Sequence, residues 1–298
     1  MPTPDPEHPI GLIAGSGQLP LLFAQKVAIE QSRPVVVAAH VGETDQRMNA
    51  LVAEVLWVPL GRFKKIVAFF RARKVRELVL VGGIAKASIW RVRPDTMALK
   101  LVWRLRHLHD DLLLRGIAAE LAALGFQVRS VTDYLPQLLA PAGVLTRRQP
   151  DESLWNDITI GWRAAKMLGQ LDIGQGVIVK RKIVITVEDI GGTDAMIARA
   201  GALTQNSSTG WAGRGEMVLV KTAKPGQDLR LDLPTVGPGT IEKMQACGIS
   251  VLAIEVNRTL LLDPEQTIRL ADRYGHIVVA CEELGMNKRM ATLELSSS

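Results

Sequence analysis

The stretch IGLIAGSGQLP, residues 10–20, joins a short apolar run to a glycine turn and the start of a helical pattern. The run Ile10–Ala14 fits a buried strand, and Gly15-Ser16-Gly17 fits a tight turn. Apolar residues then recur at helical spacing as far as Val27. A strand, a turn and a helix in this order form the first half of a βαβ unit, so the stretch predicts an α/β fold with a parallel sheet.

The rest of the first half continues this alternation. Strands are predicted at 34–39, 55–58, 78–81 and 126–131, and helices at 61–75 and from Asp110-Asp111 to Gly125. Right-handed crossovers would then place helices on both faces of the sheet. We therefore expect a Rossmann-like, nucleotide-binding N-terminal domain over residues 1–140.

A second set of elements follows a boundary rich in proline and glycine between residues 138 and 152. A helix at 154–168 precedes a predicted hairpin of strands 177–179 and 183–187. Helices at 194–203, 240–246 and 264–274 then alternate with strands at 218–221, 251–256 and 276–280. This predicts a second α/β domain with a mixed sheet over residues 150–298.

The 298 residues are 47% hydrophobic and 22% charged, which is typical of a globular protein. Only two cysteines occur and neither lies in a zinc-binding pattern, so we expect reduced thiols. The N-terminal stretch has no signal-peptide pattern, and no apolar stretch approaches about 20 residues, the length that spans a bilayer. These features predict a cytoplasmic protein whose membrane contact is peripheral.

Positive charge is concentrated in the first half. Residues 1–150 hold 20 Lys and Arg against 12 Asp and Glu, and the remainder holds 16 against 18. Such a cluster fits contact with a nucleic acid, an anionic membrane or a phosphorylated ligand, or it forms solvated helix faces. Its members are Arg62, Lys64, Lys65, Arg71, Arg73, Lys74, Arg76, Arg91, Arg93, Lys100, Arg104 and Arg106.

The first glycine turn matches a dinucleotide-binding pattern only in part. Pro20 occupies the third glycine position of G-x-G-x-x-G, and no acidic residue closes the second predicted strand. The residues Gly15, Ser16, Gly17 and Gln18 either receive a phosphate or nucleotide or form a turn without a ligand. Gly82-Gly83, after the strand at 78–81, is a similar candidate.

The stretch KPGQDLRLDLPT, residues 224–235, alternates charged and apolar residues. An extended chain would place Asp228, Arg230 and Asp232 on one face. The two carboxylates would then lie about 13 Å apart, too far to share one metal ion. The alternative is an ordinary edge strand with a charged face.

Glycines, a hydroxyl and carboxylates precede the predicted helix at 194–203. In the stretch EDIGGTD, residues 188–194, Gly192, Thr193 and Asp194 fit a phosphate cradle, or a simple helix cap. Carboxylates repel a phosphate unless a divalent cation intervenes, so the functional interpretation is a magnesium-dependent site.

Several of these motifs together resemble the two-domain UDP-2,3-diacylglucosamine pyrophosphatase family of lipid A biosynthesis, which is unrelated to calcineurin-like phosphoesterases. The motifs are IGLIAGSGQLP, LVGGI at 80–84, Asp110-Asp111, LDIGQGVIV from Leu171, GTDAM at 192–196 and KPGQDLRLDLPTVG from Lys224. The resemblance implies magnesium-dependent hydrolysis of UDP-2,3-diacylglucosamine to UMP and 2,3-diacylglucosamine 1-phosphate. It also implies that the N-terminal domain receives the nucleotide and the C-terminal domain the acylated sugar.

The resemblance assigns roles to particular residues. Asp232, in the D-L-P-T motif with Thr235, would be the catalytic or metal-binding carboxylate. Gly15, Ser16 and Gly17 would lie in the nucleotide loop, and Thr193 and Asp194 beside the sugar phosphate. Chemistry, rather than the family, suggests Lys221, Lys224 and Arg230 as stabilisers of negative charge. We further expect a homodimer that associates peripherally with the inner membrane and binds no nucleic acid.

Two other classes of function remain open from the residues alone. A Rossmann-type oxidoreductase is disfavoured by Pro20 and by the missing acidic residue. A basic protein that binds nucleic acid or membranes is suggested by the charge. Its nucleic-acid version is disfavoured because aromatic residues make up only 4% of the chain.

Overall fold

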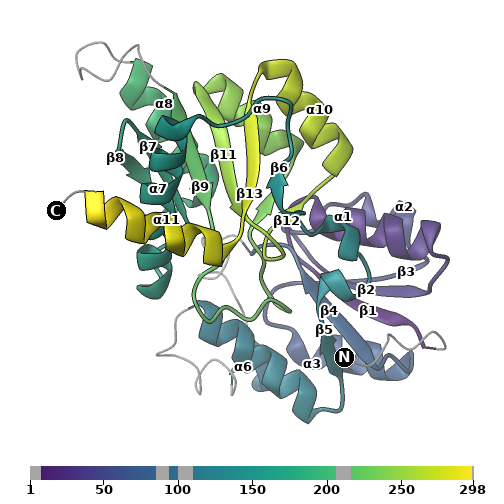
Figure 1. Ribbon diagram of the computed structural model, residues 1–298. Helices are drawn as coiled ribbons and strands as arrows, with labels where there is room; N and C mark the ends of the chain where they lie inside the picture. The colour runs from purple at the N-terminus through teal and green to yellow at the C-terminus, as the bar shows by residue number, and fades with distance from the viewer. Residues whose placement is uncertain (1–7, 85–93, 100–109, 206–215, 297–298) are drawn as a thin grey trace. The chain divides into compact units, whose positions relative to one another are not determined.

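The computed structural model describes residues 8–84, 94–99, 110–205 and 216–296 (Figure 1). The chain forms two compact units. Unit 1 comprises Met1–Pro136 together with Asp228–Asp232, and unit 2 comprises Gln137–Gln227 and Leu233–Ser298. The short segment 228–232 therefore belongs to unit 1, although the chain on both sides of it belongs to unit 2.

Unit 1 is built on a five-stranded parallel sheet in the order β3-β2-β1-β4-β5. Its strands are β1 (Ile10–Ala14), β2 (Val35–His40), β3 (Glu54–Val58), β4 (Glu77–Val81) and β5 (Gln127–Arg129). The connections run from β1 outward to β3 and then return to β4 on the other side of β1. This reversal is the topological switch of doubly wound folds, at which ligands bind beyond the carboxyl ends of the strands.

Helices cover both faces of this sheet (Figure 1). One face packs against α3 (Phe63–Ala72) and α6 (Asp110–Ala123), where Phe70, Leu121 and Phe126 form the centre of the core. The other carries α1 (Leu19–Ala24), the π-helix η1 (Gln25–Glu30) and α2 (Met48–Leu51). The 3₁₀ turns η2 (Val131–Asp133) and η3 (Pro136–Leu138) follow β5.

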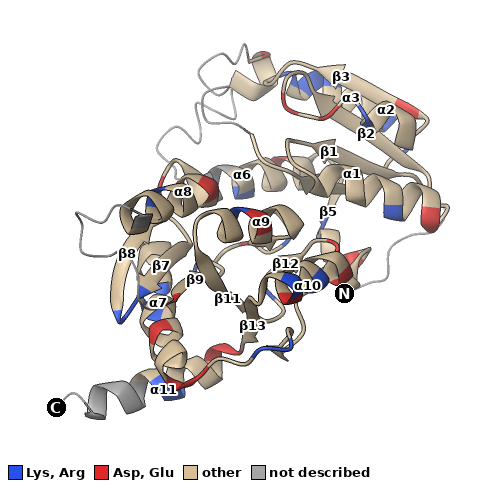
Figure 2. Ribbon diagram, turned by 90° about the horizontal axis from the view of Figure 1, so that it is seen from above, with Lys and Arg blue, Asp and Glu red and all other residues tan. Residues whose placement is uncertain are grey.

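The helix α3 is amphipathic and basic, as its sequence predicts. Its apolar residues are buried, whereas Lys64, Lys65 and Arg71 are exposed. Figure 2 shows lysine and arginine along this helix. Five members of the predicted basic cluster, Arg91, Arg93, Lys100, Arg104 and Arg106, lie outside the described residues.

Unit 2 contains a six-stranded mixed sheet in the order β6-β13-β11-β9-β7-β8. Its strands are β6 (Gly143–Val144), β7 (Gly176–Lys180), β8 (Ile183–Val187), β9 (Met217–Lys221), β11 (Ile249–Glu255) and β13 (Ile277–Cys281). The central strands β9, β11 and β13 are parallel, while β7 runs antiparallel to β9. The short strands β10 (Thr235–Val236) and β12 (Leu260–Leu261) pair separately.

The helices of unit 2 divide between the two faces of its sheet (Figure 1). The first face is covered by α7 (Glu152–Gln170) and α11 (Glu283–Ser296), with Trp162 and Met286 in its core. The second is covered by α8 (Gly192–Gln205), α9 (Pro238–Ala246) and α10 (Pro264–Tyr274). The predicted fold class, a Rossmann-like domain followed by an α/β domain with a mixed sheet, is confirmed.

The predicted hairpin between β7 and β8 is also confirmed, because the two strands pair antiparallel. Arg181 and Lys182 turn the chain with positive φ angles of 52° and 63°. The two-residue strands β6, β10 and β12 and the helix α11 were not predicted, because segments this short carry no periodic pattern and α11 carries only a weak one.

The prediction of an extended chain at 224–235 is wrong. The N–H groups of Leu231 and Asp232 both donate to the carbonyl oxygen of Asp228, at 2.9 and 3.2 Å, so the chain winds through one helical turn. The Asp228 carboxylate accepts from the N–H of Arg230 at 3.1 Å, an Asx turn that starts the winding. Leu231 packs against the core of unit 1. Asp228 and Asp232 therefore do not form an extended charged face with Arg230.

Candidate active site

Two glycine turns predicted as ligand sites lie together at the switch point of unit 1. The Gly15 N–H donates to Val81 at 2.8 Å, and the Ser16 N–H donates to the Gly83 carbonyl oxygen at 2.7 Å. The Ser16 hydroxyl donates to the same oxygen at 2.9 Å. The structure thus joins the loop after β1 to the loop after β4.

This close approach explains the glycines. A Cβ at position 15 would lie 2.3 Å from the Gly83 oxygen, and one at position 82 would lie 2.5 Å from the Ser16 oxygen. Because the N–H groups of Gly15 and Ser16 are used within the fold, they have no free hydrogen to offer a phosphate. The exposed residues of this loop are Gly17 and Gln18.

The segment 228–232 contributes the second group of unit 1. The Arg230 guanidinium donates to both carboxylate oxygens of Asp228, at 3.0 and 2.7 Å. This pairing holds the pKa of Asp228 below its usual value. The Arg230 guanidinium is therefore paired with Asp228. Asp232 is the half-buried last residue of the same turn.

In unit 2 the structure brings together Thr193, Lys221 and Thr235, three predicted site residues that lie far apart in the sequence. The Lys221 ammonium donates to the Thr193 hydroxyl at 2.9 Å and to the Thr235 carbonyl oxygen at 3.4 Å. The Thr193 hydroxyl in turn donates to Glu188 at 2.7 Å. Because β8 and β9 both run antiparallel to β7, their carboxyl ends meet at one edge, and this network lies there.

Lys221 is the unusual member of this network. The residue is only 8% exposed. Among the residues that the structure describes, no carboxylate forms an ion pair with its ammonium, whose partners are a hydroxyl and a carbonyl oxygen. A buried cation is costly without a counter-charge. Lys221 therefore favours an anionic ligand at this edge.

Three other predicted residues lie outside this network. Asp194 is exposed and pairs with Lys243. Lys224 pairs with Asp172. Gly192 adopts a positive φ of 76° at the start of α8. None of these three is part of the hydrogen-bonded chain from Glu188 through Thr193 to Lys221.

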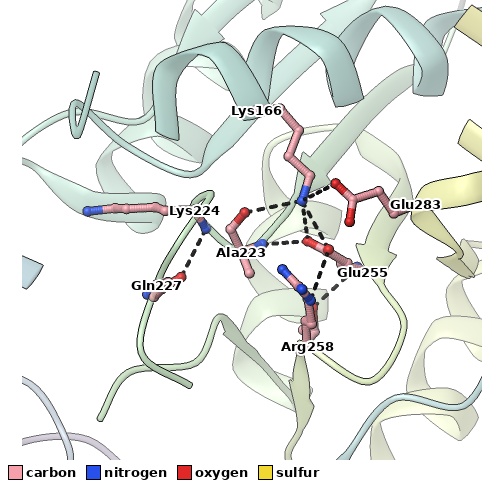
Figure 3. A network of polar contacts seen from close by, with 8 residues as sticks. Lys166, Ala223, Lys224, Gln227, Glu255, Arg258 and Glu283 are labelled. Atoms are coloured by element: carbon pink, nitrogen blue, oxygen red, sulfur yellow. Dashed lines mark hydrogen bonds and ion pairs between the residues drawn. The ribbon is translucent and has the colours of Figure 1, made fainter. Parts of the chain in front are cut away.

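A buried charge cluster in unit 2 was not predicted (Figure 3). The Lys166 ammonium contacts the two carboxylate oxygens of Glu255 at 3.0 and 2.9 Å, and Glu283 at 3.6 Å. Glu255 also accepts from the Ala223 N–H at 2.8 Å, and Arg258 lies 3.6 Å away. In the sequence, the only sign of this cluster was Glu255, a carboxylate at the end of the apolar strand β11.

The donor groups fit one kind of magnesium site. The described residues include no group of three His, Cys, Asp or Glu that could hold a metal ion. Magnesium is usually bound by one or two carboxylates with water and substrate phosphates. The carboxylate of Asp232 is the kind of single protein ligand that such a site uses. A site formed by protein ligands alone does not fit.

The fold and these groups define a two-domain α/β protein whose first domain is doubly wound and Rossmann-like. Residues 9–138 match the LpxI N-terminal domain, and residues 141–279 match the LpxI C-terminal domain. The UDP-2,3-diacylglucosamine pyrophosphatase LpxI of Caulobacter vibrioides is 31% identical over 276 residues, which cover 92% of this chain and 97% of that protein. The chain belongs to the LpxI family, which confirms the resemblance found in the sequence.

Proposed function

We propose that this chain hydrolyses the pyrophosphate of UDP-2,3-diacylglucosamine to UMP and 2,3-diacylglucosamine 1-phosphate, a step of lipid A biosynthesis. Similarity to a pyrophosphatase along nearly the full length of both chains supports this activity. The observation that carries it in the structure is Lys221, a buried ammonium whose surroundings suit an anion such as a phosphate.

The reaction needs a water molecule to attack one phosphorus while the bond from that phosphorus to the bridging oxygen breaks. Asp232 would orient this water or hold a magnesium ion. A bound magnesium ion would neutralise negative charge on the phosphate oxygens. Lys221 and the Thr193 hydroxyl would stabilise charge on the phosphate that lies at the edge of unit 2.

The two units would divide the substrate between them. The switch point of unit 1, with Gly17 and Gln18 exposed, suits the uridine nucleotide. Unit 2 would receive the acylated sugar. Arg230 and Lys224 would act by holding Asp228 and Asp172 rather than by contacting phosphate.

The diacylated substrate lies in a membrane, and the exposed basic face of α3 suits contact with anionic lipid. Among the helices that the structure describes, none is both long and apolar enough to span a bilayer. We propose a cytoplasmic protein that associates peripherally with the inner membrane and forms a homodimer.

The test is release of UMP from UDP-2,3-diacylglucosamine by the purified full-length protein, with magnesium and with EDTA. Asp232→Ala should lower kcat by about 10²- to 10⁴-fold, because a positioned catalytic group is lost. Asp45→Ala, which removes an exposed carboxylate paired with Arg47, is the matched control and should leave the rate unchanged. Unimpaired hydrolysis by the Asp232 variant would refute the assignment, and an EDTA-insensitive rate would refute the metal.

A further inference from the structure

His40 closes β2 and is only 7% exposed. Its ring nitrogen Nδ1 lies 3.0 Å from the carbonyl oxygen of Ala14, the last residue of β1. Ala14 directly precedes the glycine turn that begins at Gly15. The imidazole therefore contacts the end of β1, where the candidate nucleotide loop starts.

A threonine fixes the same corner. The Thr44 hydroxyl donates to the Ala14 oxygen at 2.6 Å and accepts from the His40 N–H at 2.9 Å. Both contacts tie the turn after β2 to the end of β1. The ring of His40 is therefore held by its own backbone and by its Nδ1 contact.

These contacts define the chemical state of the ring. A carbonyl oxygen only accepts hydrogen bonds, so Nδ1 must carry the hydrogen. Burial lowers the pKa of His40 below its usual value, which favours the neutral imidazole, although the nearby Glu43 opposes this. In the neutral ring with hydrogen on Nδ1, the other nitrogen, Nε2, is a hydrogen-bond acceptor.

The acceptor Nε2 is available to a ligand. In the part of the chain that the structure describes, no residue forms a hydrogen bond with Nε2. Nε2 is also not one of the fully buried polar atoms without a partner, so it is not completely buried. An acceptor on a ring that is nine-tenths buried, held beside the switch point, suits a donor group on a bound molecule.

We infer that His40 Nε2 accepts a hydrogen bond from the ribose 2′-hydroxyl of the nucleotide bound by unit 1. In doubly wound domains that bind nucleotides, an acidic residue near the end of the second strand accepts this hydroxyl. No acidic residue closes β2 in this chain, and the structure places His40 at that position. The inference rests on the proposed nucleotide-binding role of unit 1.

The test compares binding of UDP and 2′-deoxy-UDP to the full-length protein by calorimetry. The wild type should bind UDP roughly 3- to 10-fold more tightly, the range expected for one neutral hydrogen bond. His40→Phe keeps an aromatic ring but lacks the acceptor, so it should weaken UDP binding and leave 2′-deoxy-UDP binding unchanged. His276→Phe, at a buried histidine of unit 2, is the matched control and should keep the preference for UDP.

A measurement on the wild type avoids dependence on a variant's folding. With ¹⁵N-labelled histidine, the Nε2 resonance of His40 should shift when UDP is added and not when 2′-deoxy-UDP is added. Equal binding of the two nucleotides by the wild type would overturn the inference while leaving nucleotide binding intact. Equal losses for both nucleotides in His40→Phe would overturn the ribose contact and assign the effect to the lost Nδ1 contact with Ala14. Failure of the wild type to bind UDP at all would overturn both proposals.

Discussion

The ammonium of Lys221 differs from those of three other lysines in unit 2. Lys166, Lys224 and Lys243 each pair with a carboxylate. Lys221 contacts a hydroxyl and a carbonyl oxygen instead. Its link to the Glu188 carboxylate runs through the Thr193 hydroxyl, so an anion bound next to it would be the first charge to pair with it directly. We therefore propose that Lys221 is kept without a direct carboxylate partner because it binds an anion.

Replacing this lysine tests the interpretation. Lys221→Met should lower kcat/KM about 100-fold or more, because charge stabilisation at the phosphate is lost. Its melting temperature should stay equal or rise, since the methionine buries no unpaired charge. Steady-state kinetics and thermal unfolding measure the two effects. Lys26→Met, which removes an exposed pair with Glu30, should change neither. A large loss of stability with unchanged kinetics would assign Lys221 a structural role.

Among the secondary-structure elements, β9 and β11 end in a shared polar cluster. The Glu255 carboxylate at the end of β11 accepts from Ala223, just beyond β9, and pairs with Lys166 of α7 (Figure 3). Its side chain is only 2% exposed. The cluster thus fixes the start of the loop that leads to the segment 228–232.

Removing this carboxylate should be costly to folding. Glu255→Ala removes the nearest carboxylate of the Lys166 ammonium and leaves the Ala223 N–H without its acceptor. Breaking a buried pair typically costs about 3–5 kcal/mol. Urea unfolding monitored by circular dichroism would measure the difference. Glu265→Ala, which removes an exposed i,i+4 pair with Arg269, should cost less than about 0.5 kcal/mol. Equal effects of the two variants would contradict the structural role of the cluster.

Considered over its full length, the chain does not divide at a single point. Unit 1 includes Asp228–Asp232, which is separated by more than ninety residues from Pro136, the end of the main part of that unit. The contact is apolar, through Leu231, and includes a hydrogen bond of 3.3 Å from the Ser130 hydroxyl to the Leu229 carbonyl oxygen. The position of Asp232 within unit 1 therefore depends on this short segment.

Weakening the apolar contact should release the segment. Leu231→Ala should speed exchange of the Asp232 amide hydrogen and lower kcat, because the turn that carries Asp232 loses its attachment. Hydrogen exchange followed by mass spectrometry measures the first effect, with the strands of unit 2 unchanged. Leu284→Ala, at an exposed leucine of α11, is the control. Unchanged exchange at Asp232 would show that Leu231 does not hold the segment.

Local patterns were sufficient for most of the fold. The strand Ile10–Ala14 and the helix Pro264–Tyr274 have the predicted bounds, because the period of a buried strand or an amphipathic helix lies within the segment itself. The same reasoning failed at residues 224–235. There, alternating charged and apolar residues imitate a strand, whereas the Asp228 side chain and the packing of Leu231 wind the chain into a turn.

The candidate site depended on contacts that no local pattern contains. Lys221 and Thr193 are 28 residues apart, and Lys166 and Glu255 are 89 apart. The residue types suited to a phosphate could be identified from the sequence, because glycine, threonine, lysine and aspartate can bind a phosphate or its metal ion wherever they occur. Which of them meet depends on which strands lie side by side, and that follows from burial of the apolar faces of the sheets against their helices. Strand order thus joined Thr193 to Lys221 and placed His40 beside Ala14, while packing of Leu231 assigned Asp232 to the first unit.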